Sequence, residues 1–407
     1  MSDFDFDTLI SPTTQDQFFS EHWETKPLLI QRHQHDYYSS LLQGSDIDYL
    51  LSVASSLEGE NVELLGNTKP LSKSERKMAS AFYRAYREGS SLRIRGVNRL
   101  WKPIWTLCIR IQELFGFRVS ANLYISPADS HGLDRHYDLH DTIVLQIAGT
   151  KNWKVSGSAV ALPLEHTPLM QFERSGQDLR YRGGQLVQDV VEKYSETEPP
   201  LEFVLEPGDL LYMPRGYVHQ AWTTNELSSH VTIGIYPTTW VDLISVALGQ
   251  AGHRDVKYRK ALPVGFTQRS SDGSIGEEFK TLLRALAEEA NVSQAVEELN
   301  ASLIWNQQTI AEGLIASKNS DSITAETILE RRPGFVCRFV LDGDFVRLAA
   351  SHGELSMPRF FEASIRFVSE NQSFVVGAIP GGMSERSKIN LAQRLVDDGF
   401  MRVAKQR

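Results

Sequence analysis

The spacing of hydrophobic and polar positions changes twice along the chain. Before residue 119, stretches with helical spacing alternate with short apolar runs. Residues 15–23 and 99–115 have the apolar spacing of helices, and Gly116 is a typical residue for ending the second one. Residues 27–30 read as a short buried strand, and Ser45 followed by Asp48 indicates another helix start.

Between residues 119 and 237, short apolar runs are separated by turn residues. The predicted strands are 123–125, 142–148, 152–155, 210–213 and 231–236. Gly149-Thr150 predicts a tight turn that joins the second of these strands to its return strand, and Pro207-Gly208-Asp209 predicts another turn. Several short strands at this spacing indicate a β-sandwich or a β-barrel.

Helical spacing returns after residue 239. Helices are predicted at 241–251 and 277–303, with polar loops at 268–276 and 317–322. The last part of the chain predicts a small α+β unit, with strands at 335–341 and 345–348 and helices at about 358–369 and 384–398. These changes divide the chain into three predicted parts: 1–238, 239–328 and 329–407.

Composition narrows the class of protein. Hydrophobic residues make up 41% of the 407 positions, which is ordinary for a globular protein. No run reaches the roughly 18 apolar residues of a membrane span, and the acidic N-terminus lacks the pattern of a secretory signal. The two cysteines match no metal or redox spacing, so we expect a cytoplasmic protein. A net charge of -9 argues against direct nucleic-acid binding and would suit a basic protein partner.

Candidate metal ligands stand in two segments of the β region. His136 and Asp138 are two residues apart, so on an extended segment their side chains share a face. His219, which follows the Pro214-Arg215-Gly216 segment, can supply a third ligand. Two imidazoles and one carboxylate that leave three positions open form the ligand set of non-haem Fe(II) oxygenases. Cosubstrate and O2 need those open positions.

Other histidines offer alternatives to this set. His140 continues the face of His136 and Asp138, so an HxDxH set of ligands is possible. It lies roughly 7 Å beyond Asp138 along a strand, however, and is better placed to line the pocket. His131 and His230 read as ordinary surface or core residues.

Both segments resemble the two sequence motifs of the cupin barrels. The second motif matches at all of its fixed positions, Gly208, Pro214, Gly216 and His219. In the first motif, His-x-His has become His136-Tyr137-Asp138, and Thr142 stands where the cupins have Glu. Loss of that Glu removes the fourth protein ligand of a metallocupin and opens a coordination position, as an oxygenase requires.

A dicarboxylate cosubstrate such as 2-oxoglutarate also needs a cation in the pocket. Lys151 lies fifteen residues after His136, just past the Gly149-Thr150 turn, and a return strand would place it at pocket depth. Lys154 is three positions further along the same strand, so its side chain is predicted to point to the opposite face. Asn122 and Thr142 are predicted to contact the cosubstrate or the metal shell. The residues predicted to line the substrate groove are Arg135, Tyr137 and His140.

With these features the chain resembles the JmjC-type ribosomal oxygenases, a cupin-like group of protein hydroxylases. The matching stretches are FFSEHWETKPLLI, NLYISPADSHGLDRHYDLHDTIVLQIAGTKNWKV, LEPGDLLYMPRGYVHQAW and, near the C-terminus, INLAQRLVDDGFMRV. The resemblance covers nearly the whole chain and is strongest over residues 120–237. The stretch at 132–135 departs from the family pattern at the expected substrate entrance.

The resemblance implies an α+β fold with a double-stranded β-helix (jelly-roll) core, a helical dimerisation region and a C-terminal winged-helix-like domain. It implies Fe(II), 2-oxoglutarate and O2, with His136, Asp138 and His219 as metal ligands and Lys151 as the cosubstrate anchor. The implied enzyme is a homodimer that hydroxylates His or Arg of a ribosomal protein. Two alternatives stay open: a hydroxylase or demethylase of another peptide, and a non-catalytic cupin scaffold.

Overall fold

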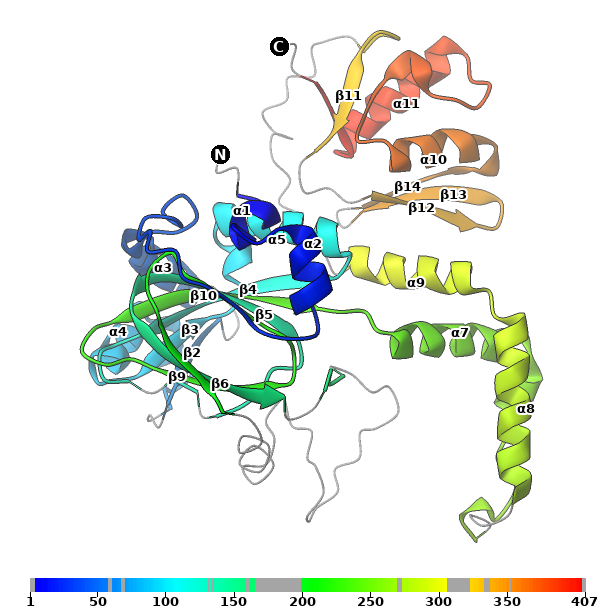
Figure 1. The fold of residues 1–407 in the computed structure, drawn as a ribbon. Helices are drawn as coiled ribbons and strands as arrows, with labels where there is room; N and C mark the ends of the chain where they lie inside the picture. The colour runs from blue at the N-terminus through cyan, green and yellow to red at the C-terminus, as the bar shows by residue number, and fades with distance from the viewer. Residues whose placement is uncertain are drawn as a thin grey trace. The chain divides into compact units, whose positions relative to one another are not determined.

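The fold is that of a computed structural model, which describes residues 4–57, 61–66, 70–130, 132–133, 135–158, 161–164, 199–268, 273–305, 323–332, 337–350 and 353–404. The chain forms two compact units, residues 1–237 and residues 238–407 (Figure 1). In the described part of the chain, no helix is both long and apolar enough to cross a membrane.

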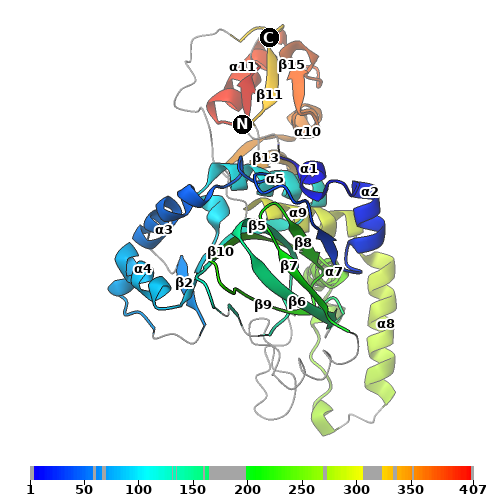
Figure 2. The ribbon, with the colours of Figure 1, turned by 60° about the vertical axis from the view of Figure 1, so that its left-hand side comes forward.

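Two antiparallel sheets form the body of the first unit. One has seven strands in the order β1-β8-β5-β10-β4-β3-β2, and the other has three in the order β7-β6-β9. Figures 1 and 2 both show β6 and β9 opposite β5 and β10 across the interior. The strands are β1 (Leu28–Ile30), β2 (Val62–Leu65), β3 (Ser91–Ile94), β4 (Arg118–Ser126), β5 (Asp141–Gly149), β6 (Lys151–Ser158), β7 (Leu201–Leu205), β8 (Leu210–Met213), β9 (Tyr217–Trp222) and β10 (Ser228–Tyr236).

Helices cover the outer face of the larger sheet. The α-helices of this unit are α1 (Phe6–Ile10), α2 (Gln15–Gln17), α3 (Ile47–Ser56), α4 (Ala79–Arg87) and α5 (Lys102–Phe115). One turn of π-helix, Phe18–His22, extends α2. The helices predicted at 15–23 and 99–115 are therefore confirmed, and the second ends at Gly116, whose φ of 69° suits glycine.

Alternation along β4 shows how the sheet acquires two different faces. Val119, Ala121, Leu123 and Ile125 are buried in one core with the apolar side of α5. The residues between them point the other way, toward the smaller sheet. Because helices close one face and the second sheet closes the other, β5 is buried on both sides, and a space enclosed between the sheets is left for polar side chains.

One predicted connection is wrong. Residues 142–148 and 152–155 are strands, as expected, but they do not pair as a strand and its return strand. β5 pairs with β8 and β10 in the larger sheet, whereas β6 pairs with β7 and β9 in the smaller one. Gly149-Thr150 is thus a corner at which the chain crosses from one sheet to the other, and Lys151 faces the interior from the opposite wall.

We expect Gly149→Ala to destabilise the first unit strongly. Gly149 has a φ of 60°, and a Cβ there would overlap the backbone carbonyl of Leu227, which cannot move freely. The expected loss in free energy of unfolding is about 3 kcal/mol or more, as for other backbone clashes. Gly116→Ala is the control, since Gly116 also has a positive φ but open space around it, and should cost about 1–2 kcal/mol. Equal urea midpoints for the two variants would contradict this account.

Three helices begin the second unit: α7 (Trp240–Arg254), α8 (Gly273–Glu289) and α9 (Val292–Trp305). The single helix predicted at 277–303 is therefore two helices. The break has a local cause, because the side chain of Asn291 accepts a hydrogen bond from the backbone N–H of Gln294 and so caps α9. The predicted loop at 268–276 is also shorter than expected, since α8 begins at Gly273.

The rest of the second unit is an α+β fold around its own core. Two three-stranded sheets, ordered β15-β11-β16 and β12-β13-β14, pack with two helices. The elements are β11 (Ile328–Arg331), β12 (Cys337–Asp342), β13 (Phe345–Ala350), β14 (Gly353–Pro358), α10 (Glu362–Glu370), β15 (Ser373–Val375), α11 (Glu385–Asp397) and β16 (Met401–Val403). β12, β13, α10 and α11 agree with the two strands and two helices predicted here, whereas β11, β14, β15 and β16 were not predicted. The predicted loop at 317–322 lies outside the described residues.

Candidate metal centre

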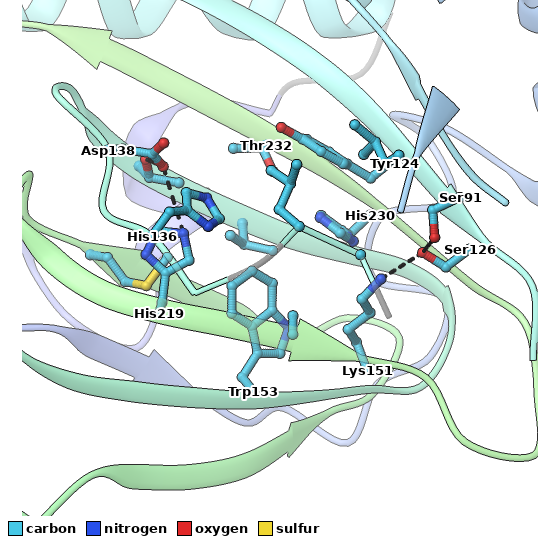
Figure 3. A pocket seen from close by; sticks show the side chains of 17 residues that line it. Ser91, Tyr124, Ser126, His136, Asp138, Lys151, Trp153, His219, His230 and Thr232 are labelled. Carbon is cyan, nitrogen blue, oxygen red and sulfur yellow. Dashed lines mark hydrogen bonds and ion pairs between the residues drawn. The ribbon is translucent and has the colours of Figure 1, made fainter. Parts of the chain in front are cut away.

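A pocket of about 530 Å³, counting its mouth, lies between the two sheets of the first unit. Figure 3 shows His136, Asp138 and His219 at one end and Lys151 at the other. The side chains between them come from both sheets and include Tyr124, Ser126, Thr142, Trp153, His230 and Thr232.

The three predicted ligands lie together. The ligand atoms of His136, Asp138 and His219 are all within 4.8 Å of one another, and they are the only such group of three in the described part of the chain. The backbones of His136 and His219 exchange two hydrogen bonds, of 3.1 and 2.8 Å, which hold the two segments side by side. The alternative His140 does not belong to the group.

Hydrogen bonds orient two of these side chains. Nδ1 of His219 lies 3.0 Å from the carbonyl oxygen of Tyr217, which can only accept, so Nδ1 carries the proton and Nε2 keeps a free lone pair. That Nε2 lies 3.8 Å from Oδ2 of Asp138. The hydroxyl of Thr142, at the vacated glutamate position, donates to the same Oδ2 at 3.1 Å. Such outer contacts fix the tautomer and direction of metal ligands.

The electrostatics keep the donors in their binding forms. Burial opposes the charge on Asp138, but His140, His219, His136 and the Thr142 hydroxyl outweigh it and lower its pKa to about 2. Burial, together with the neighbouring His136, lowers the pKa of His219 to about 4. Near pH 7 the group therefore offers a carboxylate and a neutral imidazole, as a divalent metal requires.

The other end of the pocket holds a buried cation. Lys151 is only 2% exposed, and its ammonium group donates to the Ser126 hydroxyl at 2.6 Å. Ser126 in turn accepts from Ser91 at 2.9 Å. Among the described residues, no carboxylate pairs with Lys151, and burial lowers its pKa to about 8. A buried ammonium beside hydroxyls alone is suited to an incoming anion.

Two further buried polar atoms line the same pocket. Nδ1 of His230 and Nε1 of Trp153 have no hydrogen-bond partner among the described residues. The His230 ring stacks on Tyr124, with ring centres 4.9 Å apart. Buried polar atoms normally have a hydrogen-bond partner. These two atoms are therefore available for hydrogen bonds with a polar ligand in the pocket. The donor set and this lining thus suit a divalent metal and a dicarboxylate.

Three predicted contact residues lie elsewhere. Asn122 is not among the described residues that line the pocket, because its side-chain oxygen accepts the backbone N–H of Gly96 at 3.0 Å. Tyr137 is 2% exposed and points away from its neighbours His136 and Asp138 into the protein. Arg135 is half-buried outside the lining. None of the three is among the described residues that line the pocket, and their contact with cosubstrate or substrate stays a prediction.

His140 also lies outside the pocket lining, but beside the metal group. Its Nδ1 is 3.2 Å from the Thr142 hydroxyl, and its ring packs on Tyr236 with centres 4.6 Å apart. His131 falls outside the described residues. Sequence reasoning missed Ser126, Tyr124, Trp153 and His230 as pocket residues. The two-residue periodicity of strands could have identified them. Residues 124 and 126, 151 and 153, and 230 and 232 are pairs whose side chains share a strand face.

Comparison with known proteins points the same way. Residues 98–243 match the family model described as the JmjC domain. The chain is similar to ribosomal oxygenase 1 of Homo sapiens, with 31% identity over 271 residues, or 64% of this chain and 40% of that protein. It is 32% identical, over 65% of this chain and 40% of the relative, to the bifunctional lysine-specific demethylase and histidyl-hydroxylase NO66 of Aedes aegypti. The chain thus spans well under half of these relatives.

Solved structures share the fold over nearly the full length. The ribosomal oxygenase YcfD of Escherichia coli, in complex with cobalt and 2-oxoglutarate, aligns with a TM-score of 0.53 at 16% identity. The alignment covers 97% of this chain and 99% of YcfD. A second structure of E. coli YcfD gives a TM-score of 0.56. The mixed helix-and-sheet, cupin-like fold expected from the sequence is therefore confirmed.

Proposed function

Because residues 98–243 match the JmjC domain model, we propose that this chain is an Fe(II)- and 2-oxoglutarate-dependent dioxygenase that hydroxylates a protein side chain. The observation that carries the proposal is a single pocket with a His136–Asp138–His219 donor group at one end and, at the other, the buried ammonium of Lys151, with which no carboxylate among the described residues pairs. A structural zinc site would be closed by a fourth protein ligand, and the described residues offer none.

In this proposal each residue has a defined task. His136, Asp138 and His219 hold Fe(II), which when bound supplies the O2 chemistry that an unactivated C–H bond requires. Lys151 pairs with the distal carboxylate of 2-oxoglutarate and so directs its 2-oxo acid end toward the three ligands. Trp153 and Tyr124 wall the pocket and exclude water. Overall, O2 and 2-oxoglutarate give CO2 and succinate, and one oxygen atom enters the substrate as a hydroxyl group.

Turnover tests this function. Purified protein with Fe(II), 2-oxoglutarate and O2 should form succinate, and addition of substrate should stimulate it. His136→Ala should abolish succinate formation, whereas Lys280→Ala, at an exposed position on α8 of the second unit, should not change it. An unsubstituted protein that forms no succinate with or without substrate, although iron is bound, would favour the non-catalytic scaffold.

For the substrate we propose a histidine or arginine side chain of a basic ribosomal protein. The names of the relatives support it, since ribosomal oxygenase and histidyl-hydroxylase both appear among them. Mass spectrometry of ribosomal proteins should show one that loses the mass of an oxygen atom when the gene is deleted. If every ribosomal protein keeps its mass, the substrate is another protein, and the demethylase activity named for the Aedes aegypti relative becomes the next reaction to assay.

We also propose that the enzyme is a cytoplasmic homodimer, organised as a catalytic domain (1–238), a dimerisation region (239–328) and a winged-helix-like domain (329–407). Apolar side chains on one stripe of α7 support the dimer: Trp240, Ile244 and Leu248 are 79%, 55% and 42% exposed. Sedimentation should give twice the 45.9 kDa of one chain, and a monomer at micromolar concentration would contradict the dimer. Cell fractionation tests the location, and the negative net charge speaks against nucleic-acid binding.

A further inference from the structure

The metal group is not built on one rigid element. His136 and Asp138 lie in an irregular segment before β5, and His219 lies on β9 of the other sheet. A binding site of this kind needs its donors held to within roughly 0.5 Å. Besides the His136–His219 backbone pair, the backbone N–H of Gly216 donates to the carbonyl of Asp138 at 3.0 Å. The turn at residues 214–217, which leads into His219, also needs contacts that fix its position.

A buried ion pair links the same two segments. Arg215 is 5% exposed and Asp141 is fully buried, and Nη1 of Arg215 lies 2.8 Å from Oδ2 of Asp141. The hydroxyl of Tyr212 donates to the other carboxylate oxygen at 2.8 Å. Asp141 is three residues after Asp138, and Arg215 is four before His219. Neither residue belongs to the metal group, so direct metal binding does not account for this buried ion pair.

The N-terminal segment closes this network. Oε1 of Glu24 lies 2.6 Å from Nη1 of Arg215, and the backbone N–H of Glu24 donates to the Tyr212 hydroxyl at 3.0 Å. The next residue, Thr25, accepts from the Tyr217 hydroxyl at 2.9 Å through its carbonyl. Tyr217 is the residue whose own carbonyl fixes the His219 ring. Residues 24 and 25 therefore touch the 212–217 segment at three points.

The backbone conformation of Glu24 is unusual and indicates a functional role for this residue. Its φ is 56°, a left-handed value that non-glycine residues adopt at a cost of roughly 1–2 kcal/mol. Such strain persists only where the surroundings hold it, and it gathers at functional sites. Trp23, directly before it, stacks on Tyr212 with ring centres 6.2 Å apart, and β1 then pairs with β8. The segment is thus anchored on both sides of Glu24.

We propose that Glu24 is a positioning residue for the metal site: through Arg215 it fixes the turn that carries His219 against the segment that carries Asp138. This inference rests on the proposed function, since it assumes a metal at the three donors. It assigns a task to the HWETKP stretch, which lies outside the matched domain at 98–243. Outer partners of metal ligands commonly change metal affinity by about 10- to 100-fold.

Cobalt(II) titration of the full chain, followed by its visible absorption, tests the proposal. Glu24→Ala should raise the Kd for Co(II) by about 10-fold and shift the absorption bands. Glu24→Gln keeps an acceptor for Arg215 and should restore most of the affinity. Glu21→Ala is the matched control, because Glu21 lies on the same segment in an exposed ion pair with Lys26. If Glu24→Ala does not fold, Tyr217→Phe removes the hydroxyl that donates to the Thr25 carbonyl and should change the Kd for Co(II) in the same direction.

A wild-type Kd in Glu24→Ala, or an equal loss in Glu21→Ala, would overturn the positioning role. Failure of the proposed function looks different. An unsubstituted protein that binds Co(II) through His136 but forms no succinate is not a dioxygenase, and the Glu24 comparison still decides the positioning role. An unsubstituted protein that binds no Co(II) at the three donors overturns both.

Discussion

Lys151→Met should raise the KM for 2-oxoglutarate by about 100-fold, equivalent to the roughly 3 kcal/mol of a hydrogen bond to a charged group. Methionine keeps the length and apolar character of the side chain but removes the charge. The lysine sits at the far end of the pocket from His136, Asp138 and His219, so kcat should fall much less than kcat/KM. Initial rates of succinate formation over a range of 2-oxoglutarate concentrations provide the measurement.

The neighbouring Lys154 provides the control. It lies on the same strand but on the other face, in an ion pair of 2.7 Å with the exposed Glu202, so Lys154→Met should leave KM unchanged. The pH profile adds a second check. Burial lowers the pKa of Lys151 to about 8, so the free enzyme carries the charge below pH 8 and loses it above. kcat/KM for 2-oxoglutarate should therefore decline above pH 8, and a decline that persists in Lys151→Met would show that another group is responsible.

Asp138→Asn should reduce turnover by more than 100-fold. Asparagine has nearly the same shape, but it replaces the one anionic donor of the group by a neutral amide. Loss of a direct ligand should exceed the roughly 10- to 100-fold that outer partners cost. Thr142→Val removes only the hydroxyl that donates to Asp138 at 3.1 Å, so its loss should lie within that smaller range. Single-turnover succinate yield and Co(II) affinity should rank the variants in this order.

Two results would contradict this account of Asp138. Retention of wild-type Co(II) affinity in Asp138→Asn would mean that the carboxylate is not a ligand. A Thr142→Val variant as inactive as Asp138→Asn would mean that the hydroxyl does more than orient the carboxylate, for example by contacting the cosubstrate, as the sequence first suggested.

The metal group could be predicted from the sequence because its signals are local. His136 and Asp138 share a face by their spacing alone, and His219 ends a motif with fixed turn residues. The corner at Gly149 could not be predicted in the same way. A tight turn between two strands reads as a hairpin unless the partners of each strand are known, and those partners, β8, β10, β7 and β9, come from distant parts of the chain.

The same limit applies to the lining of the pocket. Asn122 lies on the pocket face of β4 with Tyr124 and Ser126, but Gly96 happens to approach its side chain. His230 looked like an ordinary histidine because its neighbours in space, Tyr124 and Lys151, are far away in sequence. Periodicity predicts which residues share a strand face. Sheet register and chain crossings decide which of those residues reach the pocket, and local periodicity predicts neither of them.

The crossing at Gly149 gives the pocket a fixed length. It places Lys151 on β6, where Val155, four residues further on, is the partner of His219 on β9. Anchor and metal ligand are therefore separated by roughly 13 Å of backbone along the sheet, at 3.3 Å per residue. Hydrogen-bond register, rather than a loop, sets that span. For a cosubstrate bound at both ends, the sheet therefore fixes the distance between the two binding groups. We expect a 2-oxo diacid one methylene shorter to bind more weakly, because a fixed spacing between Lys151 and the metal group suits one length of cosubstrate.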